Sequence, residues 1–81
     1  MGEKTVRCKF EIHSIVKHES GEVELQSTAV CDGSPENETF WAATPGGSLS
    51  FYCVKDGVLD HLKPGDEIYL DITKAPAPAA A

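Results

Sequence analysis

Apolar and polar residues alternate with a period of two near both ends of this chain. In the segment 5–13 the apolar face consists of Val6, Cys8, Phe10 and Ile12. In the segment 67–73 it consists of Ile68, Leu70 and Ile72. Alternation of this kind is typical of a β-strand with one buried face, because successive side chains of a strand point to opposite sides. A mainly β protein is therefore predicted.

Two further strands are predicted between these segments. Residues 22–30 place Val23 and Leu25 on an inward face, and residues 48–55 alternate in the same way. The inward face of 48–55 is expected to hold Leu49, Phe51 and Cys53, with Ser50, Tyr52 and Val54 on the other face. The run 14–16 breaks the phase of the first strand, which predicts a β-bulge or the end of that strand.

One short helix is predicted at residues 35–43. Ser34 is a suitable N-cap, and Pro35 follows it at the first helical position, where its missing N–H is not needed. Glu36 and Glu38 lie in the first turn, where the helix dipole favours carboxylates. A helical turn is expected at 58–62, and a type II turn at 63–66, around Pro64 and Gly65.

An open sheet of four strands would leave half of its apolar residues in water. The predicted fold is therefore a small antiparallel β-barrel or sandwich of four to five strands with one short helix. The 81-residue chain has room for one domain, at residues 5–73. Residues 1–4 are interpreted as an N-terminal arm, and residues 74–81 as an extended Pro/Ala-rich tail.

The charge balance limits the choice of partners. The chain has 7 Lys and Arg against 13 Asp and Glu, which gives a net charge of −6. Nucleic acid is therefore an unfavourable partner, since phosphate binding needs clustered cations. The apolar runs are too short to span a bilayer and no signal peptide is visible, so we expect no membrane association.

The cysteine and histidine residues indicate neither a disulfide framework nor a metal site. Three cysteines are present without a Cys-x-x-Cys pair, so reduced thiols in a cytoplasmic product are predicted. Cys8 and Cys53 lie in apolar runs, where a thiol packs as a small hydrophobe. The three histidines lack metal-ligand spacing, and no nucleophile motif is present. We therefore predict a protein that is not an enzyme and has no cofactor.

Recognition of another macromolecule is the remaining function class. The predicted partner-binding residues are Phe40, Trp41, Tyr52, Tyr69, Arg7, Lys9, Pro76 and Pro78. Tyr and Trp are enriched at interface hot spots, and Arg7 and Lys9 make the outer face of the first strand basic. The alternative for Phe40 and Trp41 is that they plug the open end of a thin barrel.

Three segments of the chain carry a resemblance to a known group of proteins. These segments are 32–41, with Gly-Ser-x-Glu-Asn-x-x-Phe-Trp, 44–49, with Thr-Pro-x-Gly, and 62–73, with Pro-Gly-x-x-x-Tyr-Leu-Asp. Together with the opening strand, they resemble small, largely uncharacterised proteins encoded in tailed-bacteriophage genomes. The resemblance implies a virion component or an accessory protein that acts on the host, and it implies no catalytic residues.

The leading hypothesis is a non-enzymatic capsid decoration or cement protein. It would be located in the virion, assembled in the host cytoplasm, and bound to a capsid or other virion protein, with self-association. Termini that reach adjacent subunits would add avidity there. The first alternative is a phage accessory protein that binds a host defence protein or sequesters a signalling nucleotide. The second is a barrel that binds single-stranded nucleic acid on its aromatic residues.

Overall fold

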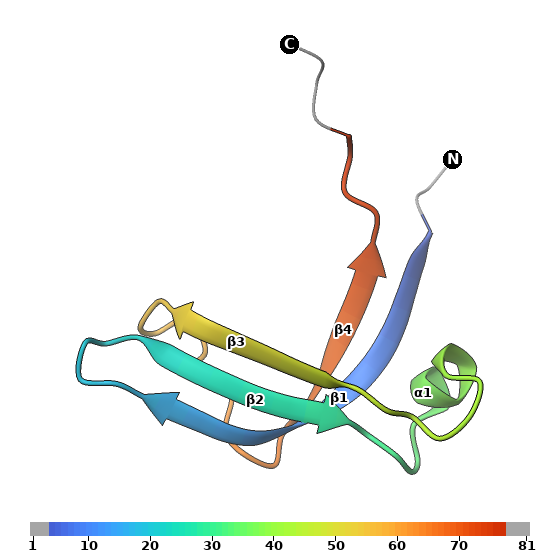
Figure 1. The fold of residues 1–81 in the computed structure, drawn as a ribbon, viewed down its shortest axis with the longest axis horizontal. Coiled ribbons are helices and arrows are strands. Elements are labelled where there is room, and N and C mark those ends of the chain that lie inside the picture. Colours follow the sequence, from blue (N-terminus) through green and yellow to red (C-terminus); the bar gives the residue numbers. More distant parts are fainter. Residues whose placement is uncertain (1–3, 78–81) are drawn as a thin grey trace.

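The protein folds into one four-stranded antiparallel sheet with one short helix (Figure 1). The computed structural model describes residues 4–77. Its elements are β1 (Thr5–Lys17), β2 (Val23–Ala29), α1 (Pro35–Phe40), β3 (Ser48–Val54) and β4 (Glu67–Thr73). The strand order is β3-β2-β1-β4, and the sheet curls into a half-barrel. The predicted mainly β fold class is confirmed.

The long strand β1 joins the two halves of the sheet. Its first half pairs with β4, from Thr5 opposite Thr73 to Glu11 opposite Glu67. Its second half pairs with β2, from Phe10 opposite Ala29 onward. The two pairings overlap only at Phe10 and Glu11, so the sheet changes neighbours and direction there. In Figure 1 the β1–β4 half stands across the β2–β3 half.

A β-bulge at His13 adjusts the phase of β1. Ile12 lies opposite Ser27 and Ser14 lies opposite Gln26, so β1 has one extra residue at this point. Ile12 is buried, and Ile15 beyond the bulge lies opposite Leu25. The bulge predicted from the break in alternation is confirmed. It keeps apolar side chains on the inner face and increases the local bend.

The alternation predicted for β3 is wrong at the C-terminal end of the strand, at Cys53 and Val54. Leu25 lies opposite Phe51 but Val23 lies opposite Val54, so β3 also has one extra residue. Cys53 takes a φ of 59° and is exposed, instead of packing as a small hydrophobe. Val54 therefore takes the inward position opposite Val23, because the extra residue shifts the period of two. Phe51 is also exposed, at 42%.

The helix begins as predicted and ends three residues early. Ser34 is the N-cap, and its hydroxyl accepts a hydrogen bond from the Asn37 N–H at 3.2 Å. Trp41 has extended φ and ψ, which leaves the helix at Pro35–Phe40. Residues 56–61 form successive turns. In the predicted tight turn that follows, Gly65 has a φ of 94° and the Asp66 N–H donates to the Lys63 carbonyl at 3.1 Å.

The hydrophobic core is small and open. Its buried apolar residues are Cys8, Phe10, Ile12, Val23, Leu25 and Ala29. The side chains that pack partly buried against its central cluster are Trp41, Leu49, Ile68 and Leu70. The radius of gyration is 15.2 Å, whereas a compact domain of this length has about 12 Å. The fold is thus extended, and much apolar surface remains exposed.

Substitutions at Cys53 test the left-handed conformation at the β3 bulge. We expect Cys53→Val to lower the free energy of unfolding by about 1–2 kcal/mol, because a β-branched side chain is disfavoured at positive φ. Cys53→Gly should stay within about 1 kcal/mol of the wild type. Urea denaturation measures both, with the exposed Cys31→Val as control. Equal stability of the two Cys53 variants would contradict the bulge geometry.

Candidate functional site

The side chain of Asn37 takes the place of a strand beside β1. The Lys9 N–H donates to Asn37 Oδ1 at 2.6 Å, and Asn37 Nδ2 donates to the carbonyls of Lys9 and Val30 at 2.9 and 2.8 Å. The amide thus pairs with the main chain of Lys9 as a neighbouring strand would. Asn37 is 1% exposed, and all its hydrogen-bonding groups are used. This interaction fixes α1 against the edge of β1 at the point where β2 ends.

The first turn of α1 is held by Ser34. Its Oγ accepts from the Asn37 N–H and donates to Glu36 Oε1 at 2.9 Å. That hydrogen bond, together with a backbone hydrogen bond and the charge of Lys9, lowers the pKa of Glu36 below its ordinary value. Glu36 is therefore a carboxylate at neutral pH, placed between the helix and β1.

The first residues of β1 have an unpaired edge on the α1 side. Main-chain groups of a strand point alternately to its two sides, so Thr5 and Arg7 direct theirs to the same side as Lys9. At Lys9 that side is filled by Asn37 and by the Val30 N–H, which donates to the Lys9 carbonyl at 3.1 Å. On the same side, the main-chain N–H and C=O groups of Thr5 and Arg7 form no hydrogen bond with any group of residues 4–77. Two residues of strand edge are therefore free to accept another strand.

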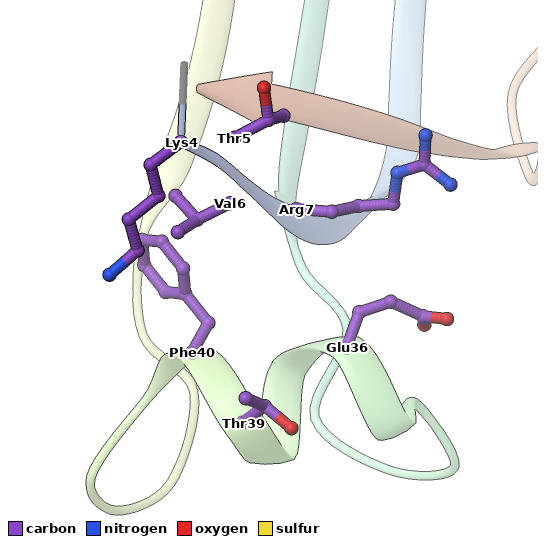
Figure 2. A pocket seen from close by; sticks show the side chains of 7 residues that line it. All are labelled: Lys4, Thr5, Val6, Arg7, Glu36, Thr39 and Phe40. Atoms are coloured by element: carbon purple, nitrogen blue, oxygen red, sulfur yellow. The ribbon is translucent and has the colours of Figure 1, made fainter. Parts of the chain in front are cut away.

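A groove lies along this free edge (Figure 2). Its volume is about 580 Å³, and seven residues line it: Lys4, Thr5, Val6, Arg7, Glu36, Thr39 and Phe40. Figure 2 shows the Phe40 ring facing Val6, with Lys4 beside them, while the Arg7 guanidinium points away from Phe40. The groove thus combines a strand edge, an apolar wall and a polar rim. We call it the β1–α1 groove.

Arg7 and Lys9 lie in a charged network that connects β1 to β4. Arg7 Nε and Nη2 donate to the Asp71 carboxylate at 2.6 and 2.9 Å, and the guanidinium lies 4.6 Å from the Tyr69 ring centre. Lys9 Nζ lies 3.4 Å from Glu67 and 3.9 Å from Glu36. The hydrogen bond from Arg7, and then its charge, lower the pKa of Asp71. The basic residues of β1 are therefore already paired with acids.

The structure brings some of the predicted partner-binding residues together and separates others. Phe40 and Arg7 line the β1–α1 groove, and Tyr69 lies on the outer face with Arg7 and Lys9. Tyr52 is 63% exposed but lies toward the end of β3 that is remote from α1 (Figure 1). Pro76 follows β4 and is exposed, and Pro78 lies outside the described residues.

Only one of the two adjacent aromatic residues packs on the core. The Trp41 ring lies 6.3 Å from Phe10, and its Nε1 donates to the Gly46 carbonyl at 3.0 Å. Phe40, 4.6 Å from Trp41, remains 40% exposed at the groove. Trp41 thus fits the interpretation as a plug for the core, whereas Phe40 is available to a partner.

Sequence reasoning found Arg7 and Phe40 but missed the other five residues that line the groove, and it missed Asn37, which fixes α1 beside β1. In the sequence Asn37 lies between two glutamates in an acidic, turn-rich run, so nothing marks it as buried. Thr5, Val6 and Thr39 are ordinary strand and helix residues. The groove arises because β2 ends opposite Phe10, whereas β1 extends as far as Thr5. The length over which two strands pair depends on both strands, so the local pattern of one strand does not predict it.

No group of three or more His, Cys, Asp or Glu side chains in residues 4–77 could hold a metal ion. All three thiols are free, and burial raises the pKa of Cys8. None of the helices in residues 4–77 is long and apolar enough to cross a membrane. Comparisons with family models, curated proteins and solved structures give no match.

Replacement of Asn37 tests its role as a substitute strand. We expect Asn37→Ala to lower the free energy of unfolding by about 2–4 kcal/mol, since it removes three hydrogen bonds from a buried site. Glu38→Ala, on the same helix but exposed, should change it by less than about 0.5 kcal/mol. Urea denaturation compares the two variants. Equal stability would show that Asn37 does not fix α1 to β1.

The Arg7–Asp71 pair predicts a pH-dependent contribution to stability. Asp71 has a lowered pKa in the folded protein, so its stabilising effect is present above its ordinary value of 3.8 and is lost as the pH falls through the folded value. At pH 7 we therefore expect Asp71→Asn to be less stable than the wild type. The difference should shrink below about pH 4 and at high salt. A difference that is independent of pH would contradict the pairing.

Proposed function

We propose that this chain is a non-enzymatic assembly protein that binds other proteins by accepting an extended segment in the β1–α1 groove. The observation that supports it is the unpaired edge at Thr5 and Arg7 beside the groove. In strand addition, main-chain hydrogen bonds supply affinity and flanking pockets select side chains. The edge at Thr5 and Arg7 would supply the main-chain hydrogen bonds, and the wall formed by Val6 and Phe40 would select the side chains.

The most concrete form of this function is decoration of a tailed-bacteriophage capsid. The resemblance of three segments to tailed-phage proteins supports a virion role. The arrangement of the ends supports it as well, because Thr5 lies opposite Thr73 and both ends of the domain therefore leave the same end of the sheet (Figure 1). Contacts of one copy with the shell and with its neighbours could then form in one place, with gains in avidity.

The alternative functions have less support. A host protein could also donate a segment to the groove, so binding of a host defence protein differs from decoration only in the partner. Nucleotide sequestration would need unpaired cations, but Arg7 is held by Asp71 and the groove also contains Glu36. The net charge of −6 opposes binding of single-stranded nucleic acid.

Co-sedimentation with capsids of the phage that encodes the chain tests the proposal. Arg7→Ala and Arg7→Pro both remove the guanidinium, but only Arg7→Pro also removes the N–H that faces the groove. We expect Arg7→Pro to bind capsids at least roughly tenfold more weakly than Arg7→Ala, because it also blocks main-chain pairing. Circular dichroism and thermal unfolding confirm that both variants fold.

Tyr52→Ala is the matched control, because it changes an exposed aromatic residue that lies far from the groove. It should bind capsids as the wild type does. If Tyr52→Ala loses binding while Arg7→Pro retains it, the groove is not the site. Absence of the chain from purified virions by mass spectrometry would contradict the decoration function itself.

A further inference from the structure

We infer that the segment bound in the β1–α1 groove is the C-terminal Ala/Pro segment, from Lys74 onward, of a second copy of this chain. The inference rests on the proposed function, in which the groove accepts an extended segment, and it names the partner. Residues 74–77 follow β4 in no regular element and are exposed. The sequence continues with Pro78 and Ala79.

The order of alanine and proline suits this groove. In an extended segment the main-chain groups of alternate residues point to opposite sides. Ala75, Ala77 and Ala79 would direct their N–H groups to one side, and Pro76 and Pro78 have none on the other side. Such a segment can donate hydrogen bonds on one side only, as an edge strand does. The groove offers the same asymmetry, with a strand edge on one side and α1 on the other.

The apolar wall of the groove makes the prolines favourable. An N–H turned toward the Phe40 ring would lose its water without gaining an acceptor, which destabilises a complex. Proline avoids this loss because it has no N–H. The alanine side chains are small enough to lie beside Val6 and Thr39 without displacing α1. Both the prolines and the alanines of the segment are therefore compatible with binding in the groove.

The geometry favours the segment of a neighbour over that of the same copy. β4 pairs with β1 on the side opposite α1, so the segment leaves Thr73 across β1 from the groove. To enter its own groove it would have to pass the start of β1 and reverse direction. The segment has no glycine, and its prolines favour an extended conformation. Figure 1 shows residues 74–77 continuing away from the sheet.

Length and charge are also compatible with exchange between copies. Eight residues in extended conformation reach about 25 Å, whereas Thr5 to Arg7 spans only about 7 Å. The segment can therefore cross to an adjacent copy and still fill the free edge. Lys74 is its only charged side chain, and it approaches a chain with a net charge of −6.

Titration of a truncated chain with a peptide tests the inference directly. The chain ending at Thr73 keeps every strand and the groove, and the probe is a synthetic peptide of residues 74–81. We expect saturable shifts of the Thr5 and Arg7 amide resonances in ¹⁵N spectra. The same peptide with Ala77→Pro should cause none, because it lacks a central N–H on the pairing side. The peptide with Pro76→Ala serves as the matched control. It should still bind, although more weakly than the unchanged peptide, because it keeps every N–H on the pairing side and adds one N–H that faces α1.

Analytical ultracentrifugation of the full chain tests whether the segment comes from a second copy. We expect concentration-dependent association that is lost on truncation after Thr73 and in Ala77→Pro, but retained in Pro76→Ala. A full chain that is monomeric at all concentrations, or a peptide that leaves Thr5 and Arg7 unchanged, would overturn the inference. Capsid binding is measured separately, so it could persist in either case and leave the proposed function standing.

Discussion

The buried amide of Asn37 is the interaction on which the arrangement of this protein depends. It pairs with both main-chain groups of Lys9 at the place where β2 ends and β1 continues. A strand edge that loses its neighbour inside a protein needs some other partner, because unpaired buried amides are costly. Asn37 supplies that partner from a six-residue helix that could not be stable alone. The helix in turn forms the wall of the β1–α1 groove.

The curled shape follows from the way β1 is shared. β4 and β2 overlap along it only at Phe10 and Glu11, so each half of the sheet follows its own direction. Bulges at His13 and near Cys53 add bend and twist. The result is a half-barrel with few buried apolar side chains and exposed strand edges. For a chain of this size, contacts with other molecules are an economical way to cover the remaining surface.

The polar residues of β1 have structural partners that limit the functions they could serve. Arg7 is occupied by Asp71 and Tyr69, and Lys9 by Glu36 and Glu67. Among the described residues at this edge, the main-chain groups of Thr5 and Arg7 are unpaired, whereas the charges of Arg7 and Lys9 are paired. This distribution favours recognition of an extended protein segment over recognition of a phosphate, and it is the basis of both proposals.

Local patterns were sufficient for much of the fold. Alternation predicted the bounds of β4 and placed Cys8, Phe10 and Ile12 on the inner face, because burial of one sheet face imposes a period of two. It also assigned Ile72 to the buried face, but Ile72 lies at the end of β4 and is 45% exposed. Ser34 and Pro35 predicted the start of α1, since capping is a local interaction. Alternation failed at Cys53, where one extra residue in β3 inverted the two faces. A bulge depends on the register with the partner strand, which a single strand does not encode.

The groove shows the same division between local and tertiary information. The sequence alone specified the strands, the helix start, the acidic charge and the alternating Ala/Pro segment, all of which are set by neighbouring residues. The tertiary structure decided that β2 stops short of Thr5, that Asn37 fills part of the gap and that Phe40 rather than Trp41 stays exposed. These features depend on contacts between residues far apart in the chain, such as Lys9 with Asn37, and so have no local signature.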